Sequence, residues 1–245
     1  MDFGSGNWAG GPIGIPFNIS TSATPKYSVS FYYPDKSDAG PYPIQSEPLI
    51  EYGSDHHLLG VDQDTCTLYE IYDANLNVNG SWSGGSGAVW DLHSNNLRPA
   101  GWTSADAAGL PILPGLARYD ELASGAINHA LRFTADNTNG YIWPARHLTS
   151  NTQNTSIPPM GARFRLKASF DITAYPQELR VILQAMKTYG IILADNGSNL
   201  YISGSPDPRW DNDMLHLLDK ITGKNFEAVD ESSLMIDPNS GAVAP

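Results

Sequence analysis

Glycine and proline are spread through the whole chain, and they limit what it can fold into more than any other feature. The 245 residues include 23 glycines and 18 prolines. Both residues interrupt regular backbone structure, because proline lacks an amide donor and glycine favours turns. Long helical bundles and coiled coils are therefore excluded, and short strands joined by many turns are expected.

Alternating polar and apolar residues predict a set of short strands. The expected strands cover residues 27–33, 57–62, 66–73, 87–92, 126–135, 163–172, 191–195, 200–204 and 226–229. The second and third of these flank a short turn and are predicted to form a hairpin. Asn196-Gly197 is the strongest short-range turn signal in the chain, so the strands on either side of it are predicted to pair as another hairpin.

Two amphipathic helices are expected in the last third of the chain. Apolar residues repeat with helical spacing over residues 176–189 and again over residues 214–221. Gly190 and Gly223 follow these segments and are expected to end the helices.

The expected fold class is mainly β, with a single domain over residues 27–235 that resembles a sandwich or jelly roll. The two helices are expected at its periphery, in the C-terminal third. Residues 1–26 are rich in glycine and proline and are expected to form an extended arm, and residues 236–245 a tail. Residues 95–118 form a long irregular stretch, which is expected to wall or cover a cleft because loops of this length are uncommon without a function.

The charge balance excludes several classes of partner. The chain carries 14 basic and 26 acidic residues, a net charge of −12, so binding to nucleic acid or to anionic lipid is not expected. It has no run of eighteen apolar residues, and therefore no predicted membrane span. Cys66 is the single cysteine, so no intramolecular disulfide can form. A surface rich in uncharged polar residues suits a secreted, extracellular protein.

Strand parity predicts a polar cleft on one face of a sheet. The ionisable residues expected to share its concave side are Glu70, Asp91, His93 and Arg165. Glu70 and Asp91 are the expected catalytic pair, one as the acid and the other as the base or nucleophile at a glycosidic bond. The alternative interpretation is an ordinary solvated face whose charges compensate one another.

The loop over residues 141–147 supplies further candidates. His147 is the expected catalytic base, because the neighbouring cation Arg146 would keep its imidazole neutral near pH 7. Trp143 is expected to stack on a sugar ring. Arg146 and Arg165 are expected to orient the substrate, and His93 to bind it.

Cofactor motifs are missing from the sequence. It contains no phosphate-binding loop, no dinucleotide fingerprint and no Gly-x-Ser-x-Gly, so no cofactor is predicted. A divalent metal ion is left open, with His57 and Asp62 as the candidate ligands, although their spacing matches no closed metal site.

Three segments carry a resemblance. They are RPAGWTSADAAGLPILPGLARYDEL with INHALRF in the stretch that starts at residue 98, YIWPARH at 141–147 and ADNGSNLYISG at 194–204. With them the chain resembles a group of exported bacterial proteins without known activity, over residues 7–235. The resemblance implies export and a single domain, and it implies no reaction.

These observations predict a secreted carbohydrate-active protein that acts on a polysaccharide or oligosaccharide, most concretely a glycoside hydrolase. A polysaccharide lyase is the nearest alternative, in which His147 or a tyrosine would abstract the C5 proton of a uronate. A non-catalytic carbohydrate-binding module and a structural surface or filament protein are the two alternatives without catalysis.

Overall fold

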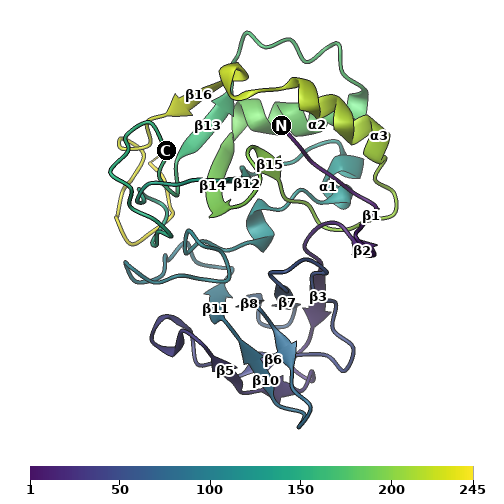
Figure 1. Ribbon diagram of the computed structural model, residues 1–245, viewed down its shortest axis with the longest axis vertical. Coiled ribbons are helices and arrows are strands. Elements are labelled where there is room, and N and C mark those ends of the chain that lie inside the picture. Colours follow the sequence, from purple (N-terminus) through teal and green to yellow (C-terminus); the bar gives the residue numbers. More distant parts are fainter. Residues whose placement is uncertain (245) are drawn as a thin grey trace.

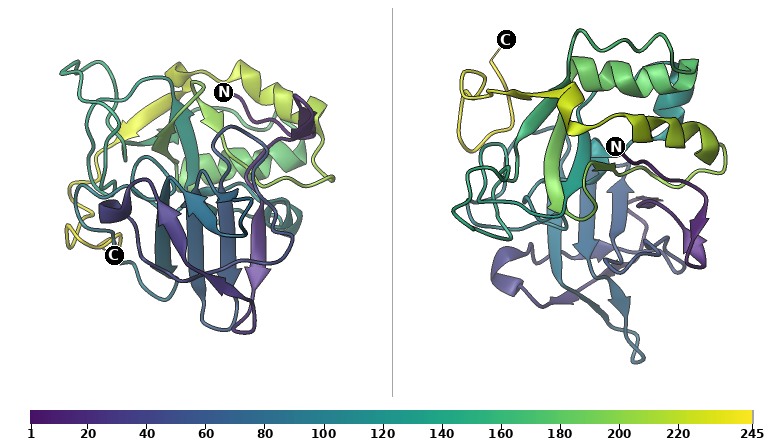
Figure 2. Two further views of the ribbon diagram at one scale, coloured as in Figure 1. Left: turned by 60° about the horizontal axis from the view of Figure 1, so that its bottom comes forward. Right: turned by 45° about the horizontal axis from the view of Figure 1, so that its top comes forward.

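Two sheets of unlike topology form the framework of the protein, shown in Figure 1 as a computed structural model that describes residues 1–244. The N-terminal sheet has the order β11-β8-β7-β3, and the C-terminal sheet has the order β15-β12-β14-β13-β16. Figure 2 shows the strands of the N-terminal sheet side by side below the C-terminal sheet and its helices. The two sheets therefore define two halves of the molecule, which meet at a central seam.

The element bounds are as follows. The N-terminal sheet contains β3 (Phe17–Ser20), β7 (Leu58–Asp62), β8 (Thr67–Tyr72) and β11 (Ser86–Asp91). The C-terminal sheet contains β12 (Leu131–Ala135), β13 (Arg163–Leu166), β14 (Ile191–Asn196), β15 (Tyr201–Ile202) and β16 (Phe226–Val229). Smaller sheets pair β1 (Asn7–Trp8) with β2 (Gly11–Pro12), β4 (Lys26–Tyr27) with β6 (Tyr42–Pro43), and β10 (Trp82–Gly84) with β5 (Val29–Phe31) and β9 (Asn75–Leu76).

The helices are few and short. The α-helices are α1 (Tyr119–Ser124), α2 (Gln177–Thr188) and α3 (Asn212–Leu215). The 3-10 helices are η1 (Pro34–Lys36), η2 (Leu113–Gly115), η3 (His216–Lys220) and η4 (Gly223–Asn225). No helix within residues 1–244 is long and apolar enough to cross a membrane.

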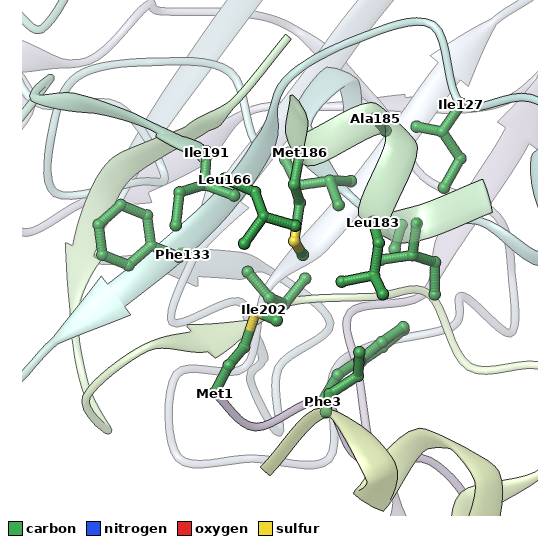
Figure 3. Packing of buried hydrophobic residues seen from close by; sticks show 14 of the residues in the cluster. Met1, Phe3, Ile127, Phe133, Leu166, Leu183, Ala185, Met186, Ile191 and Ile202 are labelled. Atoms are coloured by element: carbon green, nitrogen blue, oxygen red, sulfur yellow. The ribbon is translucent and has the colours of Figure 1, made fainter. Parts of the chain in front are cut away.

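Helix α2 closes the core of the C-terminal half. Leu179, Ile182, Leu183 and Met186 are fully buried, as their helical spacing predicts. Figure 3 shows Leu183 and Met186 packed against strand residues of the sheet and against Met1 and Phe3. Each such side chain contributes about 1.5–3 kcal/mol on burial, so this helix is a main source of stability. Gly190 follows the helix with a φ angle of +80°, a backbone conformation that residues other than glycine rarely adopt.

The predicted hairpin of residues 57–62 and 66–73 is confirmed. Strands β7 and β8 pair antiparallel, with Asp62 opposite Thr67. One carboxylate oxygen of Asp62 accepts the amide protons of Asp64 and Thr65, at 3.0 and 3.3 Å. The side chain of Asp62, the last residue of β7, therefore stabilises the turn that follows it, as in an Asx turn.

The predicted hairpin around Asn196-Gly197 is wrong. Strand β12 lies between β14 and β15, with β14 parallel to it and β15 antiparallel. The turn residues only redirect the chain, because the central position between the two strands is taken by a segment more than 50 residues earlier in the chain. The pairing partner of β14 is a strand far away in the sequence, and local turn residues do not indicate which strand that is.

Other expectations hold only at the coarser level. Strands hold 27% of the residues and helices 15%, so the fold is strand-rich but mixed. No clear single sandwich is seen in residues 1–244: the sheets are several and small, and one curls into half a barrel. The expected strand 126–135 begins only at Leu131, and 163–172 ends at Leu166. The second predicted helix is divided into α3 and η3.

Candidate functional site

A cavity of about 470 Å³ opens where the two halves of the molecule meet. Its walls come from segments that are far apart in the sequence. The segments are Tyr33 with Lys36, Asp55, Tyr72, Ser86, residues 103–107, residues 147–149, and Asp195 with Asn196. The expectation that the long loop 95–118 walls a cleft is confirmed, because residues 103–107 belong to it.

One carboxylate that lines the cavity belongs to a buried ion pair. Asp106 comes from the long loop, and its side chain is fully buried. Arg132 of β12 binds it with two parallel hydrogen bonds, from Nη2 to Oδ1 at 2.8 Å and from Nε to Oδ2 at 3.1 Å. The same guanidinium donates to the hydroxyl of Ser203. Such a forked contact is the strongest pairing open to a carboxylate.

Asp195 lies beside this pair at the end of β14. Its carboxylate oxygen Oδ2 is 3.5 Å from Nη2 of Arg132. Burial and the negative charge of Asp106 raise the pKa of Asp195 to about 8. Two neighbouring carboxyl groups that share one proton behave in this way, since both cannot carry a charge. At neutral pH Asp195 therefore holds a proton and faces the cavity as a weak acid.

A bulge in the sheet brings Asp195 to this place. The pairing of β12 with β14 shifts after Phe133, so that Arg132 lies opposite Ile192 and Thr134 lies opposite Asp195. Ala194 is the extra residue. Side chains normally alternate along a strand, and the bulge turns Asp195 to the face that also carries Arg132.

A second charged pair supports the loop from behind. Nδ1 of His57 is 2.6 Å from a carboxylate oxygen of Glu51, and Nε2 is 3.0 Å from the carbonyl oxygen of Ala105. Both partners are acceptors, so both ring nitrogens carry protons. Burial lowers the pKa of His57, but the hydrogen bond and charge of Glu51 more than offset it, and the pKa is raised. The imidazolium thus holds the residue that directly precedes Asp106.

His147 lies in the cavity in its neutral form. Its Nδ1 donates to the carbonyl oxygen of Ala107 at 3.0 Å, which leaves Nε2 as an acceptor. Nζ of Lys36 is 3.3 Å from this Nε2. Burial and the charge of Lys36 lower the pKa of His147, while the bond to Ala107 partly opposes them. Of the residues that the sequence analysis proposed as catalytic, this one lines the cavity.

The structure does not bring Glu70 and Asp91 together. Glu70 is opposite Ala88 in the sheet, and Asp91 lies three residues further along β11, so their side chains point to opposite faces. Glu70 is fully buried and accepts the amide protons of Ile112 and Leu113 and the indole proton of Trp90. Burial raises its pKa to about 7, although the two backbone amides oppose this. Its surroundings are those of an internal anchor for η2.

Asp91 and His93 form an exposed pair of their own, with Nδ1 of His93 3.2 Å from Oδ1 of Asp91. Arg165 is in the other sheet, where Nε binds Glu227 at 2.6 Å. The expected common face of these residues with Glu70 is therefore absent, because they belong to different sheets or to opposite faces of one sheet.

Arg146 and Trp143 bind the C-terminal segment and do not line the cavity. The guanidinium of Arg146 donates to the carbonyl oxygens of Arg98 and Pro238, at 2.6 Å each. The indole of Trp143 donates to the carbonyl oxygen of Ser240 at 2.9 Å. Both side chains thus fasten residues near the C-terminus to the rest of the fold.

The two metal candidates are both engaged in hydrogen bonds of the protein. Both ring nitrogens of His57 are taken, and one oxygen of Asp62 binds the turn after β7. Within residues 1–244 no group of three or more His, Cys, Asp or Glu side chains is arranged to hold a metal ion.

Sequence reasoning missed Asp106, Asp195 and Lys36. Regular alternation along β14 would put the Asp195 side chain on the face opposite to Arg132. The bulge in β14 reverses this alternation, so strand parity alone could not have found Asp195. Asp106 lies in an irregular loop where no periodicity exists. The signal that was available is the length of that loop, which did indicate a cleft.

Comparison of the chain with family models, with curated proteins and with solved structures gave no match.

Proposed function

We propose that the protein is a glycoside hydrolase whose general acid is Asp195. The observation that carries the proposal is the position of this side chain. It contacts the buried pair of Asp106 and Arg132 on one side and opens into the cavity on the other. A carboxylic acid that stays protonated near neutral pH is what cleavage of a glycosidic bond requires for the leaving oxygen.

The cavity also supplies a second carboxylate. Asp55 lies in the exposed loop before β7 and lines the same cavity as Asp195 and Tyr72. In the proposed mechanism Asp195 protonates the leaving oxygen, and Asp55 assists water or attacks the anomeric carbon. Asp195 is largely buried beside Asp106, whereas Asp55 is exposed to solvent. In the proposal this difference in environment assigns the role of acid to Asp195 and the role of base or nucleophile to Asp55.

Two tyrosines support a sugar ligand. Tyr33 is 47% exposed, and together with Tyr72 it lines the cavity. Aromatic faces of this kind stack on the apolar faces of sugar rings. Side chains with hydroxyl and amide groups, Thr103, Thr149 and Asn196, line the same space and can bind sugar hydroxyls. The charge-poor, polar composition supports action outside the cell.

One observation favours a lyase as the second candidate. His147 is neutral and lies beside Lys36 in the same cavity. A uronate lyase needs a neutral base for the C5 proton and a cation for the carboxylate. The two reactions differ in their products, since elimination yields an unsaturated uronide that absorbs in the ultraviolet and hydrolysis does not.

The test is turnover of a panel of neutral and acidic glycans, followed by reducing-end release and by ultraviolet absorbance. We expect Asp195→Asn to lose about 10²- to 10⁴-fold in kcat/KM on natural glycans. The loss should be much smaller on aryl glycosides whose leaving group needs no proton. Asp136→Asn is the matched control, because Asp136 is exposed at the end of the neighbouring strand and lies outside this cavity.

Wild-type turnover in Asp195→Asn on natural glycans would exclude the proposed acid. An ultraviolet product that disappears in His147→Gln but persists in Asp195→Asn would favour the lyase. Glycan binding without turnover in the wild type would favour a carbohydrate-binding module.

A further inference from the structure

Lys36 brings a positive charge into the cavity without a carboxylate partner. Its ammonium group contacts Nε2 of His147 at 3.3 Å, and the cavity wall includes both residues. Within residues 1–244 no carboxylate forms an ion pair with Lys36. Asp38, close to it in the sequence, is already paired with Arg98, which also binds the backbone oxygen of Lys36 at 3.0 Å. The backbone of Lys36 is therefore fixed while its charge stays free.

The other charges at and behind the loop that lines the cavity are neutralised within the protein. Asp106 is paired with Arg132, and His57 with Glu51. Asp195 keeps its proton at neutral pH because its pKa is raised to about 8. The remaining carboxylate that lines the cavity is that of Asp55, which raises the pKa of Tyr72.

We infer that Lys36 and His147 form a subsite for the carboxylate of a uronate sugar. The inference rests on the proposed action on glycans and names the class of glycan. An ammonium group has three protons. One points to Nε2 of His147, and the others are free for the oxygens of a ligand.

The single charge of the subsite favours a singly charged anion. The subsite offers one ammonium group beside a neutral ring, and a sugar carboxylate carries one negative charge, whereas a phosphate monoester carries nearly two near pH 7. The tyrosine rings of Tyr33 and Tyr72 line the same space, where the sugar ring would stack. The net charge of −12 repels anions at long range, so affinity for a uronate has to come from the short contact with Lys36.

The inference is tested by binding to the full chain, with nuclear magnetic resonance of the His147 imidazole as the readout and His147→Gln for its assignment. The probes are D-glucuronate, D-galacturonate and D-mannuronate, each beside its neutral hexose at constant ionic strength. We expect at least one uronate to bind about tenfold more tightly than its neutral counterpart. Its binding should raise the pKa of His147, because the ligand carboxylate offsets the charge of Lys36.

The decisive variant is Lys36→Met, and Lys220→Met is its matched control because Lys220 is exposed in η3, outside the cavity. Lys36→Met should abolish the preference for the uronate and raise the pKa of His147 in the free protein, while Lys220→Met changes neither. Equal affinity for uronates and neutral hexoses, or an unchanged preference in Lys36→Met, overturns the inference. Tighter binding of galactose 6-sulfate than of any uronate also overturns it.

Failure of the subsite and failure of the proposed hydrolase give different results. Asp195→Asn should keep the preference for the uronate while it loses turnover. If Asp195→Asn keeps turnover, the general acid is wrong and the subsite stands. If Lys36→Met keeps the uronate preference and Asp195→Asn loses turnover, the hydrolase stands and the subsite falls.

Discussion

Arg132 and Asp106 form a buried two-point ion pair beneath the cavity, with Nη2 2.8 Å from Oδ1 and Nε 3.1 Å from Oδ2. The pair joins β12 of the C-terminal sheet to the long loop between the two halves. Asp195 lies beside it and takes its protonation state from it. The chemistry proposed for the cavity and the assembly of the two halves therefore depend on the same side chains.

Removing the positive charge of Arg132 should destabilise the folded protein. Arg132→Met leaves Asp106 as a buried unpaired charge, and we expect the free energy of unfolding to fall by about 3–5 kcal/mol. In the double variant Arg132→Met with Asp106→Asn the buried charge is gone, so its loss should be well below the sum of the two single losses. Urea denaturation of the four proteins measures both values. Strictly additive losses would show that the two side chains are not coupled.

Asp195 should make the protein less stable as the pH rises. The pKa of Asp195 is about 8 in the folded protein, whereas that of an unfolded aspartate is about 4. Between these pH values the native state binds more protons than the unfolded state. The free energy of unfolding therefore falls with pH, by at most about 1.4 kcal/mol per pH unit. Asp195→Asn should flatten the profile measured by urea denaturation from pH 4 to 8, and Asp136→Asn should leave it as in the wild type. Parallel profiles for the wild type and Asp195→Asn would contradict the shared proton.

Glu70 should matter for stability and not for turnover. A glutamine in its place can still accept the amide protons of Ile112 and Leu113, but its amino group then faces the indole proton of Trp90. We expect Glu70→Gln to cost about 1–3 kcal/mol of unfolding free energy, with unchanged kcat per folded molecule. Asp91→Asn is the matched control, since Asp91 is exposed and should cost nothing measurable. Loss of turnover in folded Glu70→Gln would return Glu70 to the mechanism.

The charge of His57 should depend on Glu51. The folded pKa of His57 is raised above its unfolded value of about 6.5, so its contribution is complete below that pH and is lost as the pH rises through the folded pKa. In Glu51→Gln the imidazole keeps its burial without the anion, and its pKa should fall below about 6.5. A nuclear magnetic resonance titration of the His57 ring in both proteins checks this. The same pKa in both would show that Glu51 does not hold the proton.

Local patterns in the sequence were enough for the elements that depend on local contacts. The hairpin of β7 and β8 and the helix α2 follow from alternation and from helical spacing, and both are present. The pairing of β14 with β12 joins segments more than 50 residues apart, and the Asn196-Gly197 turn predicts a different partner. Sheet order is decided by the packing of distant segments, so a turn signal alone does not reveal it.

The candidate site was predictable only in part for the same reason. His147 and the long loop 95–118 were indicated by residue type and by loop length, and both line the cavity. Parity arguments assigned Glu70 and Asp91 to a common face, but the register of β8 with β11 sets them on opposite faces. Asp195 depends on a bulge at Ala194, a one-residue irregularity that only the partner strand makes visible.

The contact between Asp195 and the Arg132–Asp106 pair makes the protonated state of Asp195 a property of the folded chain. Residues of β12, of β14 and of the connecting loop must meet before Asp195 retains its proton at neutral pH. A chain with only one finished half would carry an ordinary ionised aspartate at that position. Such an intermediate would lack the proton that the proposed cleavage needs, so the proposed hydrolysis would begin only when folding is complete.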